Sequence, residues 1–334
     1  MSGSYATIAP ISSSSNGFAQ PITALSFDPV SDILWAGLNS GVVVAYLGRQ
    51  GVRGPCFRTG GNLSVKKMIA GDNHVHAADN ANEILGSWTK GGVNKWHFRS
   101  VFILFVPCKV LKQRIRPSSE LLTFSNTPSA STVLVASLMG LELVFISTMT
   151  GAVIRQAQTS SLLTHLELSH TFLVSGSSDG YVRIHDPRTG MGRPGGAENL
   201  VKAHARSIQG LQTAGSYIFT IGMSERYDGD CMMFSCLTTS RQSRPFPDPL
   251  VKVYDVRNMK ALPPIPFSAG PAFIHTNPML SSSLAIISNE GFINIVDASN
   301  PSAANEFYQV CYSRIMNSAI EVVFPLAGHL IFDV

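Results

Sequence analysis

The sequence has few charged residues for its length. Only 14% of its 334 residues are Asp, Glu, Lys or Arg, against about 25% in an average soluble protein. Long surface helices normally carry charged faces, so this composition disfavours a helical protein and favours short strands joined by tight turns. The 28 glycines and 19 prolines favour the same class of fold.

Long apolar runs, a secretion signal and a disulfide framework are also missing. The longest apolar run, Val101 to Val106, is far shorter than the roughly 20 residues of a membrane helix. The N-terminus, MSGSYATIAPISSSSNGFAQP, lacks the basic start and apolar core of a signal peptide. The five cysteines are irregularly spaced, which fits a reducing compartment. We therefore expect a cytoplasmic protein.

The net charge of +4 gives only a mild preference for acidic partners. The basic residues occur in small groups, such as Lys66-Lys67 and Arg114 with Arg116, and form no dense stripe. Direct RNA binding is therefore an alternative to an ordinary solvated surface, and the composition favours the ordinary surface.

The stretch SSDGYVRIHD, residues 177–186, combines a tight turn with an alternating, half-buried strand and recurs along the chain. The recurrences are LNSGVVVAYL (38–47), LMGLELVFIS (138–147), VKVYD (251–255), NEGFINIVD (289–297) and, less clearly, ANEILGSWT (81–89). Aligned on the last strand position, they end at Leu47, Thr89, Ser147, Asp186, Asp255 and Asp297. The intervals are 42, 58, 39, 69 and 42 residues, and three of them match the roughly 40 to 45 residues of a WD-type blade. The sequence therefore predicts an all-β, WD40-type β-propeller with about six recognisable blades.

Several polar residues have expected structural roles in these blades. Asn39, Asp179 and Asn289 are expected in the turns before the third strands. Asp186, Asp255 and Asp297 are expected to be hydrogen-bonding anchors at the ends of these strands. His204, in KAHARSIQGL, occupies the place of the histidine that opens many WD blades.

Three segments interrupt the repeat: one near 99–112, one near 227–240 and the C-terminal segment 310–334. They contain Cys108, Cys231, Cys236 and Cys311. We interpret at least two as translated introns of a faulty gene model, because Val310-Cys311 can be encoded GTATGT and Arg226-Tyr227-Asp228 permits GTATGA. Genuine insertions are the alternative. We expect a disordered Ser-rich tail over 1–20, a propeller over 21–309 and a longer intact protein, and whether this chain closes its propeller stays open.

Two segments resemble one particular family. ITALSFDPVSDILWAGLNSGVVVAY (22–46) and RQSRPFPDPLVKVYDVRNMKALPPIPFSAGPAFIHTNP (241–278) are similar to the N-terminal WD-repeat propeller of the catalytic subunit of the poly(A)-nuclease deadenylation complex, of filamentous-fungal type. SGSSDGYVRIHDPRTG fits its middle blades, and the match spans most of residues 20–309. The resemblance implies seven blades in the intact family.

The resemblance also implies a function. It implies a non-catalytic scaffold of a cytoplasmic, P-body-associated mRNA deadenylase that docks a pseudokinase regulatory subunit and helps present poly(A) RNA with poly(A)-binding protein. The family's 3′-to-5′ exoribonuclease domain uses divalent metal, Mg²⁺, held by acidic residues. No position here matches that constellation, so no enzyme activity and no cofactor are expected of this chain. A generic WD-repeat adaptor and a propeller enzyme with a central-channel site are the alternatives.

Candidate partner contacts are Tyr181, Arg183, His185 and Arg188, because aromatic and guanidinium groups are enriched in interfaces. The alternative is an ordinary strand edge and its loop.

No catalytic or metal site is predicted. His74 and His76 could hold two corners of a metal site, but the sequence places no third ligand beside them. Cys231 and Cys236 are too widely spaced for a zinc knuckle, and the common nucleotide-binding, hydrolase and zinc-protease motifs are absent.

Overall fold

The computed structural model describes residues 5–7, 21–48, 52–60, 63–79, 84–99, 121–126, 133–139, 141–169, 171–186, 199–226, 244–276, 283–290, 292–300, 306–309, 324–326 and 329–332. The regular elements in these ranges are β-strands. Within them, no helix is long and apolar enough to cross a membrane.

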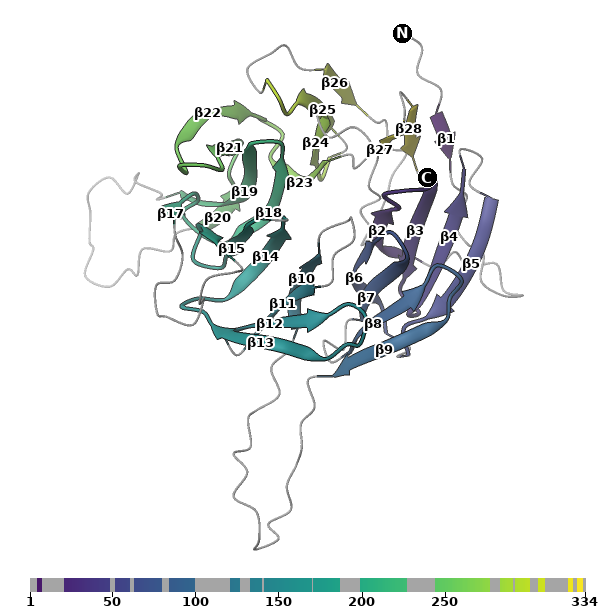
Figure 1. Ribbon diagram of the computed structural model, residues 1–334. Helices are drawn as coiled ribbons and strands as arrows, with labels where there is room; N and C mark the ends of the chain where they lie inside the picture. The colour runs from purple at the N-terminus through teal and green to yellow at the C-terminus, as the bar shows by residue number, and fades with distance from the viewer. Residues whose placement is uncertain are drawn as a thin grey trace, which may run out of the picture.

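Six antiparallel sheets, here called blades, follow one another in chain order around a ring (Figure 1). Blades 1 and 2 contain β2 (Ile22–Phe27), β3 (Ile33–Leu38), β4 (Val42–Leu47) and β5 (Val52–Arg58), then β6 (Val65–Ala70), β7 (His74–Asp79), β8 (Ile84–Thr89) and β9 (Asn94–Arg99). Blades 3 and 4 contain β10 (Leu121–Asn126), β11 (Val133–Leu138), β12 (Glu142–Ser147) and β13 (Val153–Gln158), then β14 (Leu163–Leu168), β15 (Leu173–Ser177), β16 (Tyr181–His185) and β17 (Asn199–Lys202). Blades 5 and 6 contain β18 (Ile208–Ala214), β19 (Tyr217–Arg226), β20 (Arg244–Pro247), β21 (Leu250–Asp255) and β22 (Ala261–Pro266), then β23 (Pro271–Thr276), β24 (Ser283–Ser288), β25 (Phe292–Asp297) and β26 (Glu306–Gln309).

The first strand of each blade lies nearest the centre of the ring and is called its inner strand (Figure 1). A recurring hydrogen bond connects neighbouring inner strands. A side chain near the start of one inner strand donates to the backbone carbonyl of the first residue of the next blade's inner strand. Thr23 Oγ1 donates to Val65 (2.7 Å), Lys66 Nζ to Leu121 (3.2 Å) and Thr164 Oγ1 to Ile208 (3.3 Å). The ring of sheets confirms the predicted all-β propeller class.

A small three-stranded sheet joins the two ends of the described chain. β1 (Tyr5–Thr7) pairs in parallel with β28 (His329–Phe332), which pairs antiparallel with β27 (Phe324–Leu326). Figure 1 places this sheet between blades 6 and 1. β1 thus lies within the predicted tail 1–20, and β27 and β28 lie within the segment 310–334. The predicted domain boundaries themselves stay predictions.

The core consists of apolar layers between successive blades. The layer between blades 1 and 2 contains Trp35, Val43, Val65, Val75 and Trp88, and equivalent layers follow around the ring. The two middle strands of a blade are packed on both faces, so strands such as β3, β11 and β24 are almost entirely buried. This burial explains their continuous apolar sequences.

The third strands end where the repeat was aligned. β4, β8, β12, β21 and β25 end at the aligned residues, and β16 ends one residue before Asp186. The predicted anomalous segment near 99–112 lies outside the described residues except for Arg99, and the segment near 227–240 lies wholly outside them. β19 extends beyond the residues that pair with β18 and β21, and there it pairs with β20 as a two-stranded ribbon, from Met223 opposite Pro247 to Arg226 opposite Arg244. The sequence did not predict this ribbon.

Candidate interaction surface

The turn between β15 and β16 is covered by the segment that leads from blade 4 into blade 5. Gly180 has a φ of 80°, and a Cβ atom there would lie 2.2 Å from the His204 carbonyl oxygen and 2.4 Å from that of Arg206. The Gly180 carbonyl accepts hydrogen bonds from the backbone N–H groups of Ala203 (3.0 Å) and His204 (3.2 Å). Only glycine combines this conformation with such a close approach of two backbones.

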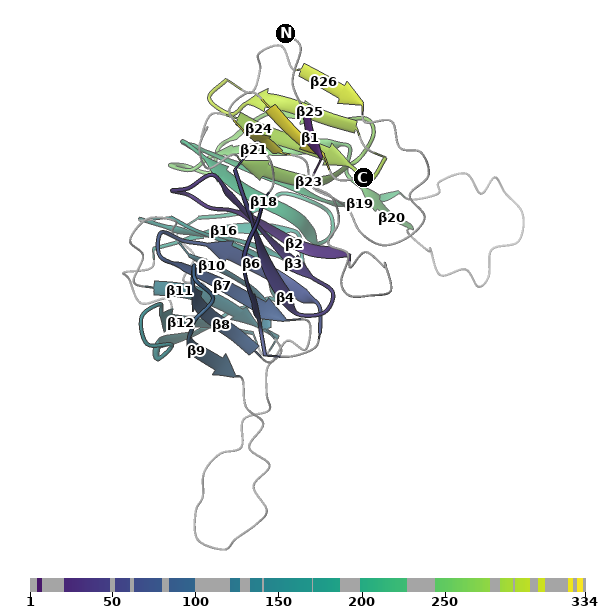
Figure 2. The same ribbon diagram turned by 90° about the vertical axis from the view of Figure 1, so that its right-hand side faces the viewer.

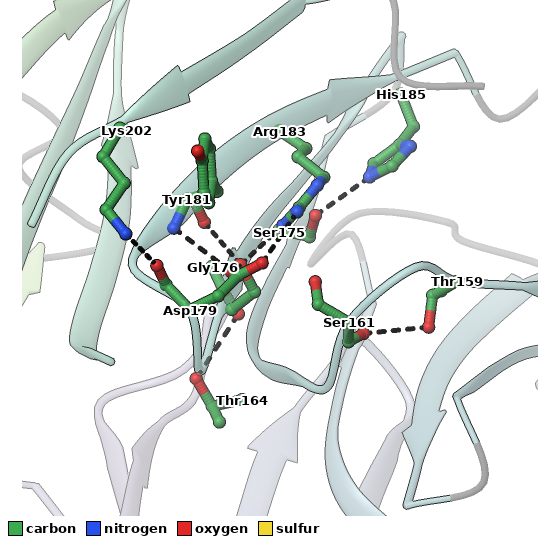
Figure 3. A network of polar contacts seen from close by, with 11 residues as sticks. Thr159, Ser161, Thr164, Ser175, Gly176, Asp179, Tyr181, Arg183, His185 and Lys202 are labelled. Carbon is green, nitrogen blue, oxygen red and sulfur yellow. Dashed lines mark hydrogen bonds and ion pairs between the residues drawn. The ribbon is translucent and has the colours of Figure 1, made fainter. Parts of the chain in front are cut away.

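A polar network stabilises this turn from within blade 4 (Figure 3). Arg183 donates from Nη1 to Ser177 Oγ (2.5 Å) and from Nη2 to Asp179 Oδ2 (3.1 Å). The Ser177 hydroxyl also donates to Asp179 Oδ1 in a very short contact. Burial alone would raise the pKa of the Asp179 carboxyl, but the hydrogen bonds from Ser177 and Arg183 and the Arg183 charge outweigh it and lower the pKa. Asp179 is therefore held as a carboxylate at the tip of the blade.

The predicted contact residues lie mostly inside this network. Arg183 and His185 are only 9% and 7% exposed, and His185 Nε2 lies 2.9 Å from Ser175 Oγ. Tyr181 is half-buried, and Arg188 lies outside the described residues. The alternating pattern indicated a strand with one solvated side, whereas β16 is the third of four strands and neighbouring blades cover both of its faces. A contact role for these residues stays a prediction.

Tyr181 and Lys202 form the accessible side of the turn. The Lys202 ammonium lies 4.9 Å from the centre of the Tyr181 ring and donates to the Asp179 carbonyl (2.7 Å). The Arg183 guanidinium lies 5.2 Å from the same ring. The ring is thus held between two cations, an arrangement that fixes it in place.

Blade 5 contains a second network at the equivalent position. His204 is buried, with Nδ1 3.0 Å from Asp248 Oδ2 and Nε2 3.1 Å from Thr220 Oγ1. Burial lowers the pKa of His204 despite the opposing effect of Asp248, so the neutral ring donates from Nδ1 and accepts the Thr220 hydroxyl. Lys252 Nζ lies 3.8 Å from the same carboxylate. Sequence reasoning found His204 but missed Asp248 and Thr220; the turn sequence FPDP before β21 was the available signal for Asp248.

The two networks support one continuous surface. Arg206, which follows His204, forms an ion pair from its Nε to Glu225 on the β19–β20 ribbon. Lys202 and Arg206 are exposed, and Tyr181, Asp179 and Glu225 are partly exposed. We call these five residues the blade 4–5 surface. Figure 2 shows the β19–β20 end of blade 5 at the side of the ring.

The remaining predicted blade residues lie at turns. Asp255 Oδ1 accepts from the Arg257 N–H (2.8 Å), and Asp297 Oδ1 accepts from the Ser299 N–H (2.9 Å) and hydroxyl (2.6 Å). The Ser299 hydrogen bonds lower the pKa of Asp297. Asn39 and Asn289 are exposed turn residues, and Asp186 directly follows β16.

The two histidines considered as metal ligands, His74 and His76, lie in different environments. His76 is buried against Trp96, with ring centres 5.8 Å apart, while His74 is half-buried at the start of β7. In the ranges that the structure describes, no group of three or more His, Cys, Asp and Glu side chains could hold a metal ion.

Comparison with known proteins identifies the family. The family model of the PAN2 N-terminal region matches residues 1–317. A PAN2-PAN3 deadenylation complex catalytic subunit from Cryptococcus neoformans is 30% identical over 311 residues, which cover 89% of this chain and 23% of that protein. The Neurospora crassa counterpart is 26% identical over 300 residues, which cover 89% and 20%. The chain therefore spans about a fifth of the length of these relatives.

Solved structures show the same fold. The Pan2 WD40 domain of Neurospora crassa superposes with a TM-score of 0.67 at 22% identity, covering 91% of this chain and 81% of that one. A computationally designed protein, Ika8, superposes with a TM-score of 0.57 at 15% identity. Together with the family match along nearly the whole sequence, the propeller assigns this chain to the PAN2 N-terminal family.

Proposed function

We propose that this chain is a non-catalytic interaction scaffold of a cytoplasmic mRNA poly(A)-tail deadenylase. The match of residues 1–317 to the PAN2 N-terminal family carries the proposal. The relatives are named as catalytic subunits of a PAN2-PAN3 complex, and this chain corresponds to about a fifth of their length. The 3′-to-5′ exoribonuclease and its divalent metal, Mg²⁺, then belong to the remainder of the protein.

The proposed partners are the PAN3-type pseudokinase subunit and poly(A) RNA coated with poly(A)-binding protein. The blade 4–5 surface supports docking because its turns are held rigid, so little conformational entropy is lost when a partner binds. Lys202 gives it an exposed cation suited to an acidic group of a partner, and Arg206, which is paired with Glu225, could share its charge with such a group.

A binding experiment tests the docking role. The 334-residue chain is immobilised and its affinity for the purified PAN3-type subunit is measured for wild type, Lys202→Glu and Arg206→Glu. Reversing either charge is expected to weaken binding about tenfold or more. Lys260→Glu, at an exposed position between β21 and β22, is the matched control and is expected to bind as wild type.

Two outcomes would contradict the proposal. Hydrolysis of poly(A) by the purified chain would show a catalytic rather than a scaffolding role. Unchanged binding by both charge reversals would remove the blade 4–5 surface from the interface. Direct RNA binding is tested separately with poly(A) at low salt, where phosphate contacts are strongest.

A further inference from the structure

The turn between β11 and β12 of blade 3 differs in composition from its counterparts in other blades. Blades 1, 3, 4 and 6 each join their two middle strands by a three-residue turn. In blades 1, 4 and 6 the turn begins with a polar residue and ends with glycine: Asn39-Ser40-Gly41, Ser178-Asp179-Gly180 and Asn289-Glu290-Gly291. In blade 3 it is Met139-Gly140-Leu141, so an apolar side chain stands at both of these positions.

Leu141 has the same backbone conformation as the glycines that it replaces. Its φ is 60°, against 73° at Gly41 and 80° at Gly180. The Leu141 carbonyl accepts a hydrogen bond from the N–H of Thr159 (2.7 Å), in the segment that leads into blade 4, and the carbonyls of the two glycines accept equivalent bonds (2.9 and 3.0 Å). A residue with a Cβ atom is strained in this conformation, so leucine is less favourable here than glycine.

Burial does not explain why a leucine is kept at this strained position. Met259 also has a positive φ, of 53°, but its side chain is 7% exposed and packs in the core between blades 4 and 5. Leu141 is 37% exposed and Met139 is 47% exposed. We call these two residues the blade 3 apolar pair. Strain at an exposed position together with adjacent exposed apolar groups is typical of an interaction site.

Hydrogen bonds connect the blade 3 apolar pair to the blade 4–5 surface. Thr159, which donates to the Leu141 carbonyl, also donates from its hydroxyl to the carbonyl of Ser161 (3.0 Å). The carbonyl of the next residue, Leu162, accepts from the N–H of Ser178 in the blade 4 turn (2.9 Å). Figure 3 shows Thr159 and Ser161 next to the Asp179 turn. The two surfaces are therefore continuous across the junction of blades 3 and 4.

Lys202 gives this continuous surface an accessible positive charge. Its ammonium donates to the Asp179 carbonyl and not to a carboxylate, and the residue is exposed. The neighbouring carboxylates have hydrogen-bond donors of their own: Asp179 accepts from Arg183, Glu225 from Arg206, and Glu142 from Gln158. The surface thus offers an apolar contact on blade 3 and a cation on blade 4.

We infer that the blade 3 apolar pair and Lys202 bind one segment of a partner protein, which carries an apolar side chain close to an acidic one. The apolar side chain packs on Met139 and Leu141, and the acidic group pairs with Lys202. This inference rests on the proposed scaffold role, and it adds the chemistry that the partner presents. The strained leucine is then retained because glycine at the same position would provide no apolar contact.

The experiment measures the affinity of the immobilised 334-residue chain for the purified PAN3-type subunit. Leu141→Gly is expected to weaken binding about fivefold or more, because the apolar contact is lost. Met139→Ser is expected to weaken it in the same direction, and it keeps the test decisive if Leu141→Gly fails to fold. Met149→Ser is the matched control: Met149 is 68% exposed beyond the other end of β12, and this variant is expected to bind as wild type.

Two further measurements separate binding from a structural role. The thermal midpoint of Leu141→Gly is expected to equal or exceed that of wild type, because glycine adopts a φ of 60° without strain. Raising the salt concentration to about 0.5 M should shrink the effect of Lys202→Glu and leave the effect of Leu141→Gly largely unchanged, because salt screens charges but does not weaken apolar contacts.

The outcomes distinguish this inference from the scaffold role. If wild type binds the PAN3-type subunit and both Leu141→Gly and Met139→Ser bind equally well, the inference is wrong and the scaffold role stands. If wild type does not bind, both are overturned. Weaker binding that occurs in both variants only with a lower thermal midpoint would show a structural role instead. Sedimentation of the chain alone gives the last outcome: self-association that Leu141→Gly abolishes would make a second copy the occupant and overturn the inference.

Discussion

At the scale of single residues, Gly180 is the position at which the blade 4 turn tolerates least change. Gly180→Ala would add a Cβ atom against two backbone carbonyls and also strain a left-handed conformation. Gly215 has a φ of 57°, but a Cβ atom there would meet no other atom within 4 Å, so Gly215→Ala adds the strain alone. We expect losses of about 1 kcal/mol for Gly215→Ala and at least about 3 kcal/mol for Gly180→Ala. Chemical denaturation measures the free energy of unfolding of both variants. Equal losses would show that the segment over Gly180, which contains His204 and Arg206, moves to accommodate the added Cβ atom.

Asn294 is a buried amide whose substitution is expected to stabilise the protein. It lies opposite Ile286, as Arg183 lies opposite Ser175 in blade 4, but neither of its polar atoms has a partner in the described residues. A buried amide without hydrogen bonds is costly, so Asn294→Leu should raise the free energy of unfolding by about 1 to 2 kcal/mol. Asn294→Asp should lower the free energy of unfolding. A lower value for Asn294→Leu would show instead that the Asn294 amide has a hydrogen-bond partner.

Buried histidines make the protein sensitive to acid. Burial, with a smaller contribution from His74, lowers the pKa of His76 to about 4. The unfolded chain binds this proton at about pH 6.5 and the folded chain does not, so stability is full above pH 6.5 and falls as the pH drops toward 4. His76→Phe should reduce that fall, measured as unfolding free energy against pH. An unchanged slope in His76→Phe would contradict this explanation.

Residue roles were predictable from the sequence only where a turn signal was local. Asp179 and His204 stand beside recognisable turn phrases, and both occupy buried or turn networks. Thr220 gives no such signal, because its partner His204 is brought to it by the pairing of β18 with β19. The burial of Arg183 was not predictable either, since it depends on the blades that flank its own.

At the scale of elements, neighbouring blades are joined by a buried ion pair as well as by apolar layers. The Asp28 side chain is 0% exposed and lies 2.7 Å from Lys90 Nζ, which comes from the β8–β9 turn. It also accepts hydrogen bonds from the Val30 and Ser31 N–H groups and from Trp35 Nε1. The pair thus ties the β2–β3 turn of blade 1 to blade 2.

Lys90→Met should be strongly destabilising, because it leaves a buried carboxylate without its counter-charge. We expect a loss of about 2 to 3 kcal/mol in the free energy of unfolding. Lys95→Met, at an exposed position on the adjacent β9, should cost less than about 0.5 kcal/mol. The double variant Asp28→Asn with Lys90→Met should recover part of the loss, and no recovery would contradict a charge-based explanation.

Strand positions were more predictable than strand exposure. The repeat located the third strands because the tight turns that precede them depend on local residues such as Asp179-Gly180. Exposure depends instead on the neighbouring sheets: β12 and β16 are buried on both faces, although their sequences include polar residues.

At the scale of the whole molecule, the segment 227–240 is expected to be dispensable. Arg226 pairs with Arg244 across the ribbon, and removing 227–240 from the intervening 227–243 leaves residues 241–243 to join the two strands. Hairpin loops of about three residues are common. The deletion should therefore keep the thermal midpoint of the full chain or raise it slightly. A deletion variant that fails to fold would show that the segment belongs to the protein, as would a spliced transcript that encodes it.

The sequence by itself determined the repeat, the positions of its third strands and the resemblance to one family, because turns and apolar runs are properties of neighbouring residues. Only the tertiary structure decided which residues of SSDGYVRIHD are accessible to solvent, because each blade is covered by its neighbours. It also brought Lys67 of blade 2 to Thr123 of blade 3, which lies 56 positions further along the sequence, where the two side chains form a hydrogen bond of 2.9 Å. No local pattern predicts that meeting, since it follows from the arrangement of the blades in a ring.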